Sequence, residues 1–250
     1  MKNLNYQLFS INLRLTNNTM VKVLKQQKSL TSAFKKRTGL GLGFAVSGVV
    51  ILIFFTQLGI VGVILIISGI VLIGRGHKFQ LGATGESLVT EALSDFPDDW
   101  YIFNDMIVAG SQIDHIVVCP KGIYTIETKN YQGTIYGNAE KPEWYQVSNY
   151  DYKTPFYNPV KQGNGHSLSL SKYLEKAVFK KIWVNTIVVF TEPSVELKVF
   201  SPKTPVIYLS ELKGFLNKEK QVMNPIYCNK IADCVSKLIP AKDNKALGKT

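Results

Sequence analysis

Three charged side chains stand inside two neighbouring apolar segments, where an unpaired charge would be costly to bury. Asp114 interrupts the first segment, residues 112–119, and Glu127 and Lys129 close the second, residues 122–129. Carboxylate oxygens are the ligands that hard divalent cations prefer, and an ammonium group can stabilise an anionic transition state. Two acids and one lysine at this spacing therefore indicate a metal-binding site suited to an anionic substrate.

Both segments have the composition of β-strands, in which side chains alternate between the two faces of a sheet. Glu127 and Lys129 then share one face. We place Lys121 and Gly122 at the centre of a tight hairpin turn. Asp114 then lies opposite Lys129, with Glu127 as its diagonal neighbour on the same face. A slip of one residue would turn Asp114 to the other face, so the prediction requires this register or one two residues away.

Further residues accompany this set in a fixed order along the chain. They are Gly85-Glu86, Gln112-Ile113-Asp114-His115, Ile126-Glu127-Thr128-Lys129-Asn130, Gly133, Trp144, and Asn158-Pro159-Val160 with Gln162. In this combination the chain resembles the PD-(D/E)xK nuclease superfamily and, within it, the nuclease-related domain family known as NERD. The resemblance runs from about Phe79 to Phe200, and Ile113 stands where most of the superfamily has proline.

The resemblance implies a restriction-endonuclease-like α/β fold with an α-β-β-β-α-β core and a central mixed sheet. It also implies metal-dependent hydrolysis of phosphodiester bonds in DNA. Asp114 and Glu127 would bind Mg²⁺ or Mn²⁺, and Glu86 would add a third carboxylate or orient a metal-bound water. Lys129 would position the attacking water or stabilise the transition state. Gln162 would hydrogen-bond Lys129 or the substrate.

Hydrophobic periodicity places these residues on definite elements. Glu86 falls in a predicted helix at 79–93, and Gln162 lies near the start of a helix that Pro159 opens and that runs to about residue 176. The other expected elements are strands at 100–108, 112–119, 122–129, 131–137, 183–190 and 206–209, and helices that begin at Ser210 and Pro225 and end before Pro240. We predict a polar, aromatic-rich loop between the strand at 131–137 and Asn158.

An uncharged stretch from Gly39 to Ile73 precedes this domain. One crossing of a bilayer needs about 20 residues, so the stretch is too long for one span and suits two short helices. We predict a transmembrane hairpin with helices at 39–56 and 58–74 and a turn at 56–59. Its basic flanks would then both stay in the cytoplasm; they are Lys35-Lys36-Arg37 before it and Arg75 and Lys78 after it. A single tilted span with an interfacial piece is the alternative.

Six glycines in this stretch could permit close helix packing; they are Gly41, Gly43, Gly48, Gly59, Gly62 and Gly69. The predicted organisation is therefore a basic segment at 1–38, a transmembrane region at 39–74, a nuclease-like domain at 79–200, a strand and helices completing it at 201–240, and a disordered tail at 241–250.

The net charge of +11 is concentrated near the start of the chain. Residues 1–38 hold eight basic side chains and no acid, whereas the remainder holds 21 basic and 18 acidic ones. Net charge alone is therefore a weak argument for nucleic-acid binding by the main domain. Lys172, Lys176 and Lys180 recur every four residues and would form a basic stripe for phosphates if the helix extends that far. An ordinary solvated helix face is the alternative.

Other reactive side chains are interpreted structurally. His115 should face away from Asp114 and pack in the interior, and His77 and His166 have no partner at metal spacing. The three cysteines include no CxxC pair, which argues against a zinc ribbon or a disulfide framework; they are Cys119, Cys228 and Cys234. The aromatic side chains between Trp144 and Tyr157 could stack on unpaired bases, although packing over the sheet is favoured.

These observations lead to a main hypothesis and two alternatives. The main one is a multi-pass protein of the cell membrane whose cytoplasmic domain is a Mg²⁺- or Mn²⁺-dependent nuclease acting on DNA. The first alternative is a non-catalytic module that binds nucleic acid or a protein at the membrane. The second is a structural membrane protein with a decayed domain, which would bind neither metal nor nucleic acid.

Overall fold

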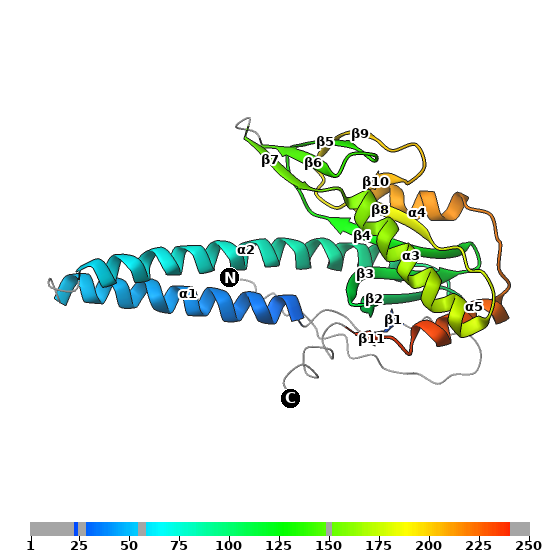
Figure 1. The fold of residues 1–250 in the computed structure, drawn as a ribbon, viewed down its shortest axis with the longest axis horizontal. Coiled ribbons are helices and arrows are strands. Elements are labelled where there is room, and N and C mark those ends of the chain that lie inside the picture. The colour runs from blue at the N-terminus through cyan, green and yellow to red at the C-terminus, as the bar shows by residue number, and fades with distance from the viewer. Residues whose placement is uncertain (1–22, 25–28, 55–58, 149–151, 241–250) are drawn as a thin grey trace.

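The computed structural model describes residues 23–24, 29–54, 59–148 and 152–240. Two long helices, α1 (Ser29–Phe54) and the first part of α2 (Gly59–Ser94), form a helical arm that extends from a domain built around a central sheet (Figure 1). Most of the predicted basic segment at 1–38, most of the predicted turn at 56–59 and the predicted tail at 241–250 lie outside the described residues.

Helix α2 joins two helices that the sequence predicts separately, at 58–74 and 79–93. It runs without a break from Gly59 to Ser94. The prediction of two separate helices here is therefore wrong. The reason is that isolated glycines such as Gly74 and Gly76 cost only about 1 kcal/mol each in a helix, which longer-range packing can offset.

Glycines bring the two helices of the arm close together. A Cβ atom at Gly48 would lie 2.5 Å from the carbonyl oxygen of Gly62, and one at Gly69 would lie 2.5 Å from that of Gly41. Gly43 has open space around it instead. Most of the predicted glycine contact is therefore confirmed, and Gly43 lies outside it.

The predicted transmembrane character of this arm is not supported. In the part of the chain that the structure describes, no helix combines the length and the apolarity needed to cross a bilayer. The bounds of α1 and α2 also differ from the predicted spans at 39–56 and 58–74, since α1 begins at Ser29 and α2 ends at Ser94.

The central sheet confirms the predicted mixed α/β fold. Its strand order is β1-β2-β3-β4-β8-β10, with β11 also paired to β2. The strands β2, β3 and β4 run antiparallel, whereas β4, β8 and β10 run parallel. Their bounds are β1 Val23–Leu24, β2 Tyr101–Val108, β3 Ser111–Cys119, β4 Gly122–Lys129, β8 Asn185–Phe190, β10 Val206–Tyr208 and β11 Ile239–Pro240.

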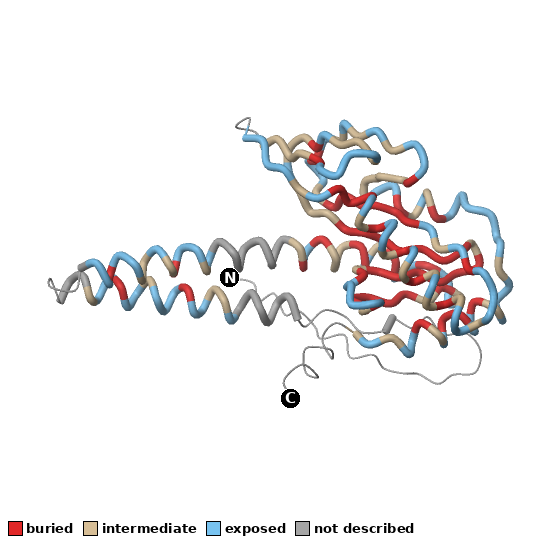
Figure 2. Tube along the Cα trace, viewed as in Figure 1, coloured by how far each residue is buried: buried red, intermediate tan, exposed pale blue. Residues whose placement is uncertain are grey.

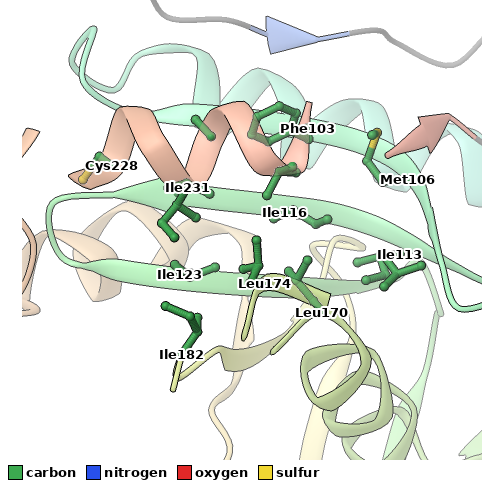
Figure 3. Close-up of a cluster of buried hydrophobic side chains, with 14 residues drawn as sticks. Phe103, Met106, Ile113, Ile116, Ile123, Leu170, Leu174, Ile182, Cys228 and Ile231 are labelled. Carbon is green, nitrogen blue, oxygen red and sulfur yellow. The ribbon is translucent and has the colours of Figure 1, made fainter. Parts of the chain in front are cut away.

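Helices cover both faces of this sheet, so its central strands are buried (Figure 2). Helices α3 (Pro159–Val178) and α5 (Pro225–Val235) pack on one face. Phe103, Ile116, Leu174 and Ile231 meet between that face and the two helices (Figure 3). Helices α2 and α4 (Leu209–Lys218) pack on the other face. Burial on both faces explains why β3 and β4 are nearly continuous apolar runs.

A second sheet stands where the sequence predicts mostly loop. Its order is β7-β6-β5-β9; the bounds are β5 Thr134–Asn138, β6 Glu143–Val147, β7 Lys153–Tyr157 and β9 Glu196–Phe200. Trp144, which is 0% exposed, packs so closely on Gly137 that a Cβ there would lie 2.3 Å from its ring. The aromatic residues of this segment thus include strand residues, in line with their β propensity. The predicted packing role holds for Trp144.

The glycine contacts of the arm can be tested with a matched pair of substitutions. We expect Gly69→Leu to separate α1 from α2, because the new side chain would meet the backbone of Gly41. Gly43→Leu, placed in open space on the same arm, should leave the contact intact. Hydrogen exchange of the amides at 60–73 measures this. Equal protection in both variants would contradict the close contact.

Candidate active site

The sheet brings Asp114, Glu127 and Lys129 to the face covered by α3. Cys119 pairs with Gly122 and His115 with Ile126. Continuing this register places Asp114 opposite Glu127, so the predicted pairing of Asp114 with Lys129 is wrong by two residues.

The hairpin turn explains the shift of register. The turn is centred on Pro120 and Lys121, because proline has its φ fixed near the value that the first central position of a common turn requires. Gly122 follows with a φ of 144°. A shift of two residues leaves every side chain on its predicted face.

Glu127 is the most buried charged residue of this group, at 2% exposed. Its Oε1 lies 2.7 Å from the Nζ of Lys129, and its Oε2 lies 3.3 Å from Nδ1 of His166. Burial alone would raise the pKa of Glu127, but His166 and Lys129 outweigh it and hold that pKa below its ordinary value. Lys129 also donates to Oε1 of Gln162 at 3.3 Å, so the predicted partner of Gln162 is present.

The start of α3 is fixed by Asn158, which is fully buried. Its side-chain oxygen accepts hydrogen bonds from the backbone N–H groups of Val160 and Lys161 and so caps the helix. Its side-chain nitrogen donates to the carbonyl oxygens of Asn138, Ala139 and Lys141 in the second sheet and the turn after it. This cap sets the position of Gln162, one turn into the helix.

Further along, α3 approaches the sheet closely enough to reach Glu127. A Cβ at Gly163 would lie 2.5 Å from the Thr186 side chain, so only glycine fits here without a shift. Ser167 then bonds to Thr125 at 2.5 Å and to Thr186 at 2.7 Å. These contacts place His166, four residues after Gln162 and on the same side of the helix, against Glu127.

Asp114 occupies a different environment on the same face. Its Oδ2 accepts a hydrogen bond from the backbone N–H of Thr128 at 2.9 Å. Burial, followed by the charge of Glu127, raises the pKa of Asp114 to about 7 against the lowering effect of that hydrogen bond. The two carboxylates therefore differ, since Glu127 is held ionised and Asp114 is close to taking up a proton.

Two more acids face this pair. Burial, then the charges of Asp114, Asp105 and Glu127, raise the pKa of Glu86 to about 9. Glu86 reaches the group because Gly85 lets α2 approach the strand ends, where a Cβ would lie 2.9 Å from Asn130 and from Thr191.

Asp105 falls within the predicted strand at 100–108 and is not among the predicted site residues. It has a φ of 56°, in the left-handed region, and accepts a hydrogen bond from Gln112 at 2.8 Å. In the β2–β3 hairpin the register of Asn104 with His115 and of Met106 with Ile113 places Asp105 opposite Asp114. The tight turn at Ala109-Gly110 is the sequence signal that could have identified this neighbour.

His115 and His166 have different environments in the structure. His115 is buried, and its Nδ1 lies 2.7 Å from Oδ1 of Asn104. Burial lowers the pKa of His115 to about 3, so it is a neutral interior residue, as predicted. His166 has no predicted role in the site, and the structure places its Nδ1 against Oε2 of Glu127. Because His166 follows Gln162 by four residues, the two lie on the same side of a helix, and this spacing could have indicated that His166 reaches the site.

The three cysteines of the chain are free, and Cys119 and Cys228 are buried. The sequence argues against a disulfide framework, and the free cysteines agree with that prediction.

The predicted basic stripe divides into two parts. Lys172 and Lys176 are exposed on α3, whereas the helix ends at Val178 and Lys180 lies beyond it. Lys180 therefore does not continue the helical stripe. It lines a cavity at the end of the domain.

The site residues can be compared with the needs of a divalent cation. Within the described ranges, no group of three or more His, Cys, Asp and Glu side chains is arranged so that it could hold a metal ion. The donor chemistry nevertheless fits, because Asp114, Glu127 and Glu86 supply carboxylate oxygens. Oε2 of Glu127 is also buried, and its contact with Nδ1 of His166 at 3.3 Å does not have hydrogen-bond geometry.

Because the acids of the site lie close together, we expect the free energy of unfolding to depend on pH. The pKa of Glu86 is about 9 in the folded protein and 4.5 ordinarily, so between these values folding requires a proton that the unfolded chain lacks. Stability that is present below pH 4.5 is therefore lost as the pH rises towards 9.

Replacing Glu86 with glutamine should remove this loss. We expect Glu86→Gln to raise the free energy of unfolding by roughly 1–3 kcal/mol at pH 8–9 and by little at pH 4.5. Denaturant unfolding at several pH values measures this. Glu91→Gln, an exposed position on the same helix, is the control and should show a constant difference. A Glu86→Gln effect that is also constant with pH would contradict the assignment.

Comparison with known proteins agrees with this geometry. Residues 81–191 match the family model of the nuclease-related domain, NERD. An uncharacterized protein of Bacillus anthracis is 29% identical over 160 residues, which cover 62% of this chain and 65% of that protein. No solved structure matches the chain. Residues 81–191 are thus similar to the nuclease-related domain, and this similarity points to a nuclease-related function.

Proposed function

We propose that the domain is a metal-dependent nuclease that hydrolyses phosphodiester bonds of DNA with Mg²⁺ or Mn²⁺. The observation that carries this proposal is the buried Glu127, held ionised between Lys129 and His166 with one oxygen lacking a hydrogen bond. Its neighbours Asp114 and Glu86 add carboxylates whose pKa values are raised by burial first and by mutual repulsion second. A cation would relieve that repulsion.

Each site residue has a role in this proposal. Asp114 and Glu127 would hold the cation, and Glu86 would add a third carboxylate. When bound, such a cation lowers the pKa of water and offsets the charge of the phosphate. Lys129, which is positioned by Gln162, would hold the phosphate oxygens and stabilise the charge that develops on them.

One observation favours the alternative of a non-catalytic binding module. Lys129 and His166 both already contact Glu127, so the buried carboxylate is balanced by the protein itself. Such a site could serve only to stabilise the sheet, while nucleic acid or a protein partner binds elsewhere on the domain. Metal binding separates the two proposals, because only the nuclease requires it.

A cleavage assay with matched variants tests the nuclease. The full-length protein is incubated with single-stranded and double-stranded DNA in Mg²⁺, in Mn²⁺ or in chelator. We expect cleavage with either metal, and a loss of about 100-fold or more in Asp114→Asn and Glu127→Gln, because transition-state contacts of this kind contribute two to three orders of magnitude. Glu140→Gln, an exposed acid on a turn, is the control and should retain full activity.

Calorimetric titration with Mn²⁺ completes this test. Heat that disappears in Glu127→Gln and persists in Glu140→Gln would support the metal site. If no DNA is cleaved with either metal and no Mn²⁺ binds, the nuclease proposal is rejected.

We further propose that the helical arm attaches the domain to the inner face of the cell membrane. Support comes from the uncharged sequence between Gly39 and Ile73 and from large apolar side chains exposed on both helices. They include Leu40, Leu42, Val46, Val50, Ile60, Ile64, Ile67 and Ile70. Contiguous apolar surface of this extent usually marks an interaction site. Basic flanks such as Lys36 and Arg37 favour the cytoplasmic side.

Cell fractionation tests this attachment. We expect the full-length chain in the membrane fraction, released by detergent and retained in high salt, because apolar burial is not screened by ions. Ile64→Lys with Ile67→Lys should shift it towards the soluble fraction, whereas Tyr136→Lys, an exposed site on the domain, should not. Wild-type protein that remains soluble without detergent would refute the proposal.

A further inference from the structure

A basic cavity lies at the end of the domain opposite the helical arm. It has a volume of about 630 Å³ and lies where the β3–β4 turn, the segment after α3 and the segment between α4 and α5 meet. The segment between α4 and α5 runs along that end of the molecule (Figure 1). Five lysines line the cavity, against one acid, Glu219; they are Lys121, Lys180, Lys181, Lys218 and Lys220. The cavity therefore presents positive charge to any ligand.

The wall of this cavity is held in place by defined hydrogen bonds. Lys121 donates to the carbonyl oxygens of Asn217 at 2.5 Å and Glu219 at 2.9 Å, and so binds the end of α4 to the β3–β4 turn. The backbone N–H groups of Val222 and Met223 donate to the carbonyl oxygen of Pro120 at 2.8 and 2.9 Å. One lysine is therefore structural, and the cavity is preformed.

The other four lysines remain available for an anion. Among the described residues, no carboxylate lies within ion-pair distance of Lys180, Lys181, Lys218 or Lys220. All four are exposed. Four unpaired cations around one cavity suit the phosphates of a nucleic-acid strand, whose counterions are released on binding.

Aromatic rings accompany these cations. Trp183 is 74% exposed, although Trp100 and Trp144 are almost completely buried. The Nζ of Lys181 lies 5.7 Å from the centre of the Trp183 ring, and that of Lys180 lies 5.6 Å from the centre of the Tyr227 ring. The Tyr227 hydroxyl also has no hydrogen-bond partner among the described residues. Tyr227 is only partly exposed, so Trp183 is the ring on which an unpaired base can stack.

The cavity and the candidate active site lie at opposite ends of β4. Gly122 lines the cavity at the start of the strand, and Lys129 belongs to the active site at its end. A rise of about 3.3 Å per residue separates them by roughly 20–25 Å. At 3.4 Å per nucleotide along one strand, that is about six or seven nucleotides of stacked DNA.

We propose that this cavity is a second binding site for DNA, which holds a single-stranded segment by its phosphates and stacks a base on Trp183. The inference rests on the proposed function, because the DNA strand held in the cavity is the one that reaches the active site. Single-stranded DNA is favoured over a duplex because stacking on Trp183 requires an unpaired base.

Fluorescence anisotropy with the full-length protein tests this site. The probe is a labelled oligodeoxythymidylate of about 12 nucleotides, and chelator prevents cleavage. We expect Lys180→Glu with Lys218→Glu to weaken binding at least tenfold and to lower the slope of log K against log salt by about 1.4, or 0.7 for each lost phosphate contact. Lys203→Glu with Lys237→Glu changes the net charge equally, outside the cavity, and should weaken binding less than threefold.

Tryptophan fluorescence provides an independent readout. We expect the oligonucleotide to quench wild-type emission, and Trp183→Phe to abolish the quenching while keeping part of the affinity. Equal weakening by the two lysine pairs, or quenching unchanged in Trp183→Phe, would overturn the proposal. The proposal would also be overturned if Lys180→Glu with Lys218→Glu lost binding to vesicles containing phosphatidylserine but kept its binding to the oligonucleotide. Repeating the anisotropy and quenching measurements in Asp114→Asn separates the cavity proposal from the nuclease proposal. The cavity would still bind and quench in this variant even if the domain cleaves no DNA.

Discussion

The burial of one ionised carboxylate, that of Glu127, imposes the arrangement of everything around it. A buried charge is tolerated only when it is paired, and removing one partner from such a pair typically costs about 3–5 kcal/mol. The chain meets this demand from two elements, with Lys129 on the same strand and His166 on α3. Helix α3 must then begin and dock at one position, which the cap at Asn158 and the close approach at Gly163 determine. Several residues that look unrelated in the sequence therefore serve one electrostatic requirement.

The surrounding acids work against stability. Asp114, Asp105 and Glu86 lie close enough to Glu127 or to one another for their charges to raise the pKa of a neighbour. Asp105 is also held at a positive φ, which costs a residue other than glycine conformational energy. A fold selected only for stability would place apolar or neutral residues at such positions. If the domain is the proposed metal-dependent nuclease, this concentration of like charge serves its function, because a cation or a phosphate-bearing ligand would alter the balance of charge.

The sequence predicted what depends on local pattern and missed what depends on long-range pairing. The buried strands and the common face of the acids followed from period-two alternation, which a register shift of two residues cannot disturb. That shift came from Pro120, whose fixed φ selects a different turn centre. Asp105 and His166 join the site only through a neighbouring hairpin and a docked helix. Of the second sheet only β5 was predicted, as the strand at 131–137; β6, β7 and β9 were missed because they are short, and the buried residues of the four strands are only Ile135 and Trp144.

Helix α2 runs without a break from the arm to the candidate active site, where it carries Glu86. A cut before residue 75 follows the predicted organisation, yet it would fall inside a helix that carries Glu86 two turns or more further on. A helix gains stability from cooperative propagation along its length, so its new end would fray towards Gly85. The contacts of Gly85 with Asn130 and Thr191 would then have to hold Glu86 in place alone. For this reason the position of Glu86 depends on a helix that begins before the matched region at 81–191, and the intact chain is the appropriate unit for measuring metal binding and cleavage.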